Sequence, residues 1–109
     1  MTWEEGESLI LLRQTLHAHP ELSGMEVETA GRLKRFITEH TGLAIDDFGH
    51  WFAARYRVGE DRPHIVLRAD LDALPIDETI PLPYRSTNRG VSHKCGHDGH
   101  AAALAGVAL

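Results

Sequence analysis

The segment Ser92–His100 constrains this chain most, because it gathers metal-binding groups at positions where the backbone can turn. It contains the only cysteine, Cys95, three of the eight histidines and two glycines. Cys95 and His97 are two residues apart, so in an extended segment their side chains point to one side and can converge on one cation. Thiolate and imidazole bind borderline-soft divalent metals, with zinc as the default. The spacing favours a metal site, but two or three donors do not complete a four-ligand site, and a lone cysteine is usually a small buried hydrophobic residue.

Asp98 has two alternative roles within this segment. Its carboxylate could cap the N-terminus of a following helix, or it could hold the second ring nitrogen of a histidine that ligates a metal. The flanking Gly96 and Gly99 allow a tight bend and leave room for an ion or a substrate. Both roles of Asp98 stay open at the level of the sequence.

The overall composition excludes several classes of protein. Eleven Lys and Arg residues stand against sixteen Asp and Glu residues, a formal net charge of −5, and no basic stripe indicates nucleic-acid binding. A single cysteine cannot form an internal disulfide, which favours a reducing compartment. No apolar stretch approaches the roughly 20 residues that cross a bilayer, and the first seven residues do not resemble a signal peptide. We therefore expect a cytoplasmic chain of at most one domain that contacts neither nucleic acid nor membrane.

Apolar residues at helical spacing predict three helices. The first covers residues 3–18 and is closed by the following proline. The second covers about 24–40, with a capping box formed by Ser23 and Glu26 and a C-terminal stop at Gly42. The third is rich in small residues, covers 101–109, and is expected to pack closely against a sheet.

Two strands and a long loop separate the second and third helices. Residues 51–58 alternate as in a half-buried strand, and 65–67 form a continuous apolar run typical of a strand covered on both faces. Charged residues begin directly after this second run, at the end where α/β sheets bind ligands. A proline-containing loop over 73–89 then leads to the cysteine and histidine segment. This order predicts a mixed α/β fold.

Three motifs, in this order, resemble the N-terminal part of the metal-dependent amidohydrolases of the aminoacylase and carboxypeptidase type. They are Leu16–Ser23 with Glu26 and Thr29, then Leu67–Ile76, then His93–His100. Within that group they are closest to the branch of N-acyl-amino-acid amidohydrolases, hippurate hydrolase, auxin-conjugate hydrolases and N-acetyl-diaminopimelate deacetylase. The resemblance covers nearly the whole chain. It implies an α/β catalytic domain with a mixed sheet flanked by helices, of which residues 1–109 are an incomplete part.

The resemblance implies a role for several residues. Cys95 matches a cysteine ligand thought to bridge two divalent metals, and His97 matches a histidine ligand. Asp72 matches the catalytic-motif aspartate that orients a metal ligand, whereas Asp70 stands where the wider clan has a histidine ligand. His100 matches a recurrent position without a clear ligand role. Asp70, His100 and Asp98 are therefore candidates for contacts behind the ligands or on the substrate side.

Two basic residues close to these motifs are interpreted as supporting residues. Lys94 departs from the residue common in the family, and a cation beside Cys95 would favour the thiolate. His17, at the end of the first helix, is expected to be favoured by the helix dipole rather than to act in catalysis. We therefore expect a His17→Ala change to leave metal occupancy largely intact.

The function implied by the resemblance is hydrolysis of the amide bond of N-acyl amino acids or small peptides by a water that two divalent ions activate. Zinc, manganese, nickel or cobalt could serve. In the family the glutamate base, the remaining ligands and a lid or dimerisation domain lie downstream, and full-length members are expected to be homo-oligomers. Residues 1–109 alone are therefore expected to be a partial catalytic domain without activity. The alternative is a stand-alone, non-catalytic module that binds a metal or a partner protein.

Overall fold

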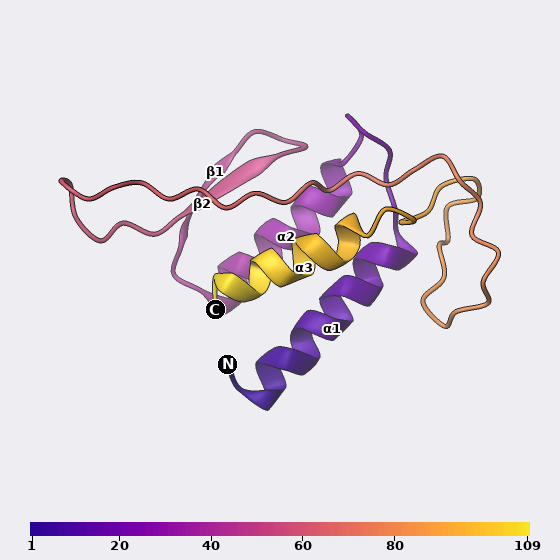
Figure 1. Ribbon diagram of the computed structural model, residues 1–109, viewed down its shortest axis with the longest axis horizontal. Coiled ribbons are helices and arrows are strands. Elements are labelled where there is room, and N and C mark those ends of the chain that lie inside the picture. The colour runs from indigo at the N-terminus through magenta and orange to yellow at the C-terminus, as the bar shows by residue number, and fades with distance from the viewer.

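The computed structural model describes all residues from Met1 to Leu109, with three helices grouped together and a small sheet beside them (Figure 1). The helices are α1, Trp3–Ala18; α2, Val27–His40; and α3, His97–Val107. Strands β1, Ala44–Asp47, and β2, Phe52–Arg55, pair in antiparallel fashion, with Ala44 opposite Arg55. Helices together with a sheet confirm the predicted α/β class. None of the three helices is long and apolar enough to cross a membrane.

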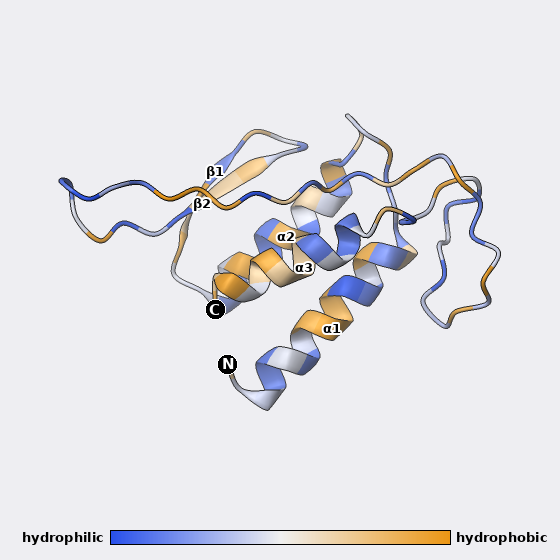
Figure 2. Ribbon diagram, viewed as in Figure 1, coloured by the Kyte–Doolittle hydropathy of each residue, from blue (hydrophilic) through white to orange (hydrophobic).

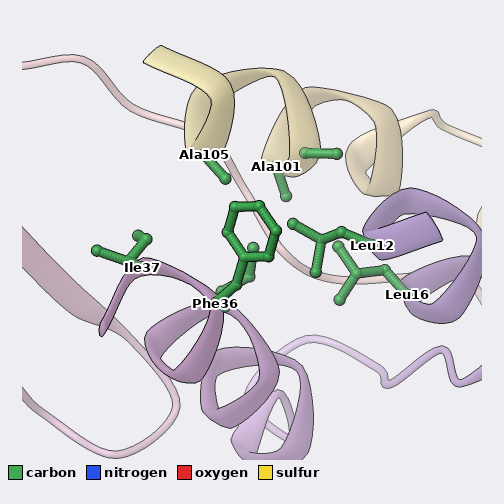
Figure 3. Close-up of a cluster of buried hydrophobic side chains, with 8 residues drawn as sticks. Leu12, Leu16, Phe36, Ile37, Ala101 and Ala105 are labelled. Atoms are coloured by element: carbon green, nitrogen blue, oxygen red, sulfur yellow. The ribbon is translucent and has the colours of Figure 1, made fainter. Parts of the chain in front are cut away.

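The hydrophobic core lies between the three helices rather than between helices and sheet (Figure 3). The prediction that the C-terminal helix packs against a sheet is therefore wrong. Small residues let α3 approach α1 closely, since a Cβ added at Gly106 would lie 2.9 Å from the Leu9 Cδ1 atom. The core consists of eight buried side chains: Leu12, Leu16, Leu33, Phe36, Ile37, Ala101, Ala102 and Ala105.

The N-termini of α1 and α2 are capped in different ways. α1 has the predicted bounds, and Thr2 and Glu5 form a capping box at its start. The capping box predicted for α2 is absent, and this helix begins at Val27 rather than near residue 24. The Glu21 carboxylate instead accepts the backbone N–H of Thr29 at 2.5 Å and that of Glu28 at 3.3 Å. A carboxylate from outside the helix thus satisfies two free donors and offsets the helix dipole.

The strands differ from the sequence-based expectation in two respects. Only Phe52–Arg55 of residues 51–58 forms a strand, and its partner, β1, was not predicted. The apolar run 65–67 belongs to no strand, and its side chains are exposed, Ile65 at 87% and Val66 at 86%. Figure 2 shows this run as an apolar stretch of the extended chain that follows the β-hairpin. The prediction of a buried strand there is wrong, because such a strand needs neighbours on both sides and this run pairs with no other segment of residues 1–109.

The segment 73–89 is a loop, as predicted, and isolated bridges tie its start to the connection between α1 and α2 and to the segment before α3. Leu22 pairs with Ala73, and Leu74 exchanges two backbone hydrogen bonds of 3.0 Å with Ser92. Farther along, Thr87 donates its backbone N–H to Ala18 at the end of α1. These contacts hold the loop against the end of α1 and place its last residues directly before α3.

Candidate metal centre

His97 is the first residue of α3, and its ring is held from the loop side. The structure places Nδ1 2.9 Å from Oδ1 of Asp72 and 3.0 Å from the Asp72 backbone oxygen. Because both partners are acceptors, Nδ1 carries the hydrogen and donates it. A neutral ring then has its lone pair on Nε2, which no protein group hydrogen-bonds. Metal-ligating histidines are usually held in this way, with one nitrogen donating to a carboxylate or carbonyl and the other left for the ion.

Cys95 lies two residues before His97, with an exposed thiol that has no disulfide partner. Gly96, between them, has φ 93° and is the N-cap of α3. Beside His97 is an open cleft of about 370 Å³. Its lining residues come from the extended chain before Asp72 and from the exposed side of α3: Arg68, Ala69, Asp70, His97, His100 and Ala103.

The structure brings three of the predicted residues to one side of this cleft. Asp70, His97 and His100 line it together, and the rings of the two histidines are 6.1 Å apart. The Asp70 carboxylate accepts hydrogen bonds of 2.8 and 3.0 Å from the Arg68 guanidinium, and these bonds hold the pKa of Asp70 below its ordinary value. Asp70 is therefore ionised at neutral pH and paired with Arg68.

The donor chemistry fits a divalent ion, but the donors form only part of a site. A thiol and an imidazole with a free Nε2 are suitable zinc ligands. No group of three or more His, Cys, Asp or Glu side chains is arranged to hold an ion. Cys95 and His97 are therefore two candidate ligands and do not by themselves complete a site.

A buried ionic network lies behind the ligand residues and centres on His17. The His17 ring contacts two carboxylates, Asp98 Oδ2 at 2.8 Å from Nδ1 and Glu78 Oε2 at 2.8 Å from Nε2. Asp98 also accepts from Arg13 Nε at 2.9 Å. Asp98 is inside α3 and not at its N-cap, so that alternative is wrong. Asp98 does hold a histidine, but it is His17 and not the candidate ligand.

Lys94 belongs to the same network and does not supply a free charge beside Cys95. Its Nζ atom lies 2.7 Å from Glu78 Oε2. Burial alone would raise the pKa of Glu78, but the hydrogen bonds from Lys94, the Ser86 N–H and His17 outweigh it and lower this pKa to about 2. The Lys94 charge is therefore paired with Glu78, and its influence on the Cys95 thiol stays a prediction.

His93 is buried and has no hydrogen-bond partner on either ring nitrogen. Burial lowers the pKa of His93, since the charged form would be desolvated. Its ring centroid lies 6.3 Å from that of His17. His93 is thus a buried ring beside His17, a position that its sequence context did not reveal.

The two glycines of this segment are expected to respond to substitution with opposite signs. Gly96 has a left-handed backbone, so Gly96→Ala should lower the free energy of unfolding by about 1 kcal/mol. Gly99 lies inside α3 with open space around an added Cβ, so Gly99→Ala should raise it by about 0.5–1 kcal/mol. Urea denaturation of both variants measures the difference. A loss of equal size at both positions would contradict the left-handed role of Gly96.

The Glu78 carboxylate is expected to make the fold sensitive to acid. Its pKa is lowered in the folded chain from 4.5 to about 2, so its contribution is complete above about pH 4.5 and is lost as the pH falls toward 2. That difference corresponds to roughly 3 kcal/mol. Comparing urea denaturation of wild type and Glu78→Gln at pH 7 and pH 3 tests this, because the variant should lose less stability on acidification. Parallel losses in both proteins would contradict the prediction.

The chain is similar to known proteins over most of its length. Residues 66–109 match the model of the peptidase family M20/M25/M40. The N-acetylcysteine deacetylase of Bacillus subtilis is 43% identical over 103 residues, which are 93% of this chain and 27% of that protein. The N-acyl-L-amino acid amidohydrolase of Geobacillus stearothermophilus is 41% identical over 109 residues, 92% of this chain and 27% of that protein.

A solved structure has the same fold over the matched region. The Bacillus subtilis YxeP protein, described as a dinuclear metal-binding peptidase of the M20 family, superposes with a TM-score of 0.91 at 41% identity. The match covers 98% of this chain and 31% of that chain. Residues 1–109 thus have the fold of the matched part of that structure. Over residues 66–109 the chain matches the peptidase family M20/M25/M40, and it spans about a quarter of the length of its curated relatives.

Proposed function

We propose that this chain supplies part of the two-metal centre of an enzyme that hydrolyses the amide bond of N-acyl amino acids. Cys95 and His97 would be metal ligands, and Asp72 would orient His97. The observation that carries the proposal is the 2.9 Å hydrogen bond between Asp72 Oδ1 and His97 Nδ1, which leaves Nε2 free. The names of the relatives, a deacetylase of N-acetylcysteine and an N-acyl-L-amino acid amidohydrolase, support this substrate class.

The residues of the chain would each perform a limited task in that centre. A pair of divalent ions, when bound, polarises an amide carbonyl and lowers the pKa of water toward neutrality. The Cys95 thiolate would offset the repulsion between two cations, and Asp72 would raise the basicity of His97 by accepting its Nδ1 hydrogen. The proton-transferring glutamate and the other ligands would lie outside residues 1–109. The chain would then be a partial catalytic domain, inactive alone, and its single cysteine supports a reducing, cytoplasmic location.

A chimeric enzyme tests this proposal, because a longer relative supplies the rest of the catalytic domain. Residues 1–109 would replace the matching segment of the Bacillus subtilis N-acetylcysteine deacetylase. We expect the chimera to hydrolyse N-acetylcysteine, and a panel of acetyl, benzoyl and indoleacetyl amino acids and of dipeptides would show the acyl preference. A folded chimera without amidase activity on any of these would refute the proposal. Tight stoichiometric metal binding by the 109-residue chain alone would instead favour the stand-alone module.

A further inference from the structure

The two residues that flank the candidate ligands are both anchored in the protein interior. Lys94 precedes Cys95, and its ammonium group lies 2.7 Å from Glu78 Oε2. Asp98 follows His97, and its carboxylate is 1% exposed. The segment from Cys95 to His97, here called the ligand segment, is therefore fixed at both ends while its own thiol stays exposed.

A single side chain joins these two anchors. His17 Nε2 lies 2.8 Å from the Glu78 oxygen that Lys94 also contacts, and His17 Nδ1 lies 2.8 Å from Asp98 Oδ2. Ionised carboxylates only accept hydrogen bonds, so both nitrogens of His17 have to donate. The chain of contacts thus runs from Lys94 through Glu78, His17 and Asp98 back to α3.

The surroundings of His17 keep this connection rigid. Its side chain is 5% exposed, both carboxylates are 1% exposed, and the Tyr84 ring packs edge-on at 5.4 Å. Arg13, one turn earlier on α1, also donates to Asp98 at 2.9 Å. α1 therefore presents two donors to Asp98, of which His17 is buried and Arg13 is partly exposed.

We propose that His17 is a positioning residue, which fixes the spacing of Cys95 and His97 before a metal binds by holding both flanks of the ligand segment through Glu78 and Asp98. The inference rests on the proposed function, in which these two residues are ligands. Gly96 gives the segment conformational freedom that the metal would otherwise have to remove on binding. Because its flanks are held, the segment is already ordered when the chain folds, and the metal does not have to order it on binding. This replaces the expectation that His17→Ala leaves metal occupancy intact.

The first test needs no metal. His17→Gln removes one of the two donors, because a side-chain amide cannot donate from both of its ends. In the 109-residue chain, we expect backbone amides of residues 95–98 to exchange about tenfold faster with water, and the slowly exchanging His97 Nδ1 proton to disappear from nitrogen-correlated spectra. Leu12→Ala is the control, because it creates a cavity in the hydrophobic core and removes no hydrogen bond to residues 94–98. Its amides at 95–98 should keep the wild-type exchange rates relative to the other amides of α3.

The second test measures the consequence for a metal, with Co²⁺ as the probe and the chimeric enzyme as the host. The thiolate-to-cobalt absorption should titrate about tenfold more weakly in His17→Gln than in wild type, and Leu12→Ala should retain wild-type affinity. Lys94→Met should weaken binding, whereas Lys94→Arg, which keeps a donor to Glu78, should restore it. Rescue by arginine would not be expected if the network served only global stability.

The outcomes separate this inference from the proposed function. Wild-type exchange rates at residues 95–98 and wild-type Co²⁺ affinity in His17→Gln would overturn the positioning role. A chimera that fails to bind Co²⁺ through Cys95 would count against the proposed function instead. In that case the metal-free exchange comparison still decides whether His17 holds the ligand segment.

Discussion

Replacing Cys95 by serine is expected to remove most of the bound metal from the chimeric enzyme, with an affinity loss on the order of 100-fold. The thiol is exposed, so we expect the substitution to leave the fold intact. A serine hydroxyl is a hard, neutral donor that stays protonated at neutral pH, whereas thiolate is anionic and soft. Metal content after dialysis, with chelator competition for Zn²⁺, measures the loss.

His100→Ala provides the matched control for this prediction. His100 is exposed, lies one turn into α3, and lines the cleft beside His97. Its loss should leave metal content near the wild-type value, although substrate affinity can change. Equal metal losses in Cys95→Ser and His100→Ala would show that the cleft binds metal without a specific role for the thiol.

The helices could be predicted from local pattern, but the start of α2 depended on a contact from outside the helix. Trp3–Ala18 follows from the spacing of Leu9, Leu12 and Leu16, all within one helix. The start of α2 depends on Glu21, which reaches forward to the N–H of Thr29 in a contact that no capping-box spacing describes. Side-chain periodicity reports which face of a helix is buried. It does not indicate which group from outside the helix accepts the free backbone N–H groups of the first turn.

The strands were harder to predict, because strand formation requires a partner. Ala44–Asp47 contains two acidic residues and shows little alternation, yet it pairs with β2 and Asp46 binds Arg55 there. The run 65–67 has the composition of a buried strand and remains exposed because no segment of residues 1–109 pairs with it. Composition indicated a strand at 65–67 and not at 44–47, whereas the pairing depends on the rest of the structure.

The candidate ligands could be found from sequence, and the residues that hold them could not. Cys95 and His97 are adjacent in a short motif, so their spacing alone suggested a common cation. The resemblance to a family, rather than spacing, linked Asp72 to a ligand 25 residues away. Nothing local connects His17 to Glu78 and Asp98, which are 61 and 81 residues distant. Only the packing of α1 against α3 and the loop brings these charges together.

Asp98→Asn is expected to cost the folded chain about 3 kcal/mol, measured by urea denaturation in the presence of a chelator. The substitution keeps the shape of the side chain but removes the buried negative charge that faces His17 and Arg13. Removing one member of a buried ionic network leaves its partners uncompensated, which typically costs 3–5 kcal/mol. The lower end applies here because the Arg13 side chain is 37% exposed and can turn toward water.

Asp46→Asn is the appropriate comparison, since Asp46 forms an ion pair with Arg55 on an exposed strand. Such pairs contribute up to about 1 kcal/mol, because water screens both charges. The two variants make the same chemical change, and they differ in whether the lost charge is buried. A loss at Asp98 that is no larger than the loss at Asp46 would mean that the network around His17 is hydrated in solution. His17 would then lack the rigid contacts by which it holds the residues on either side of Cys95 and His97.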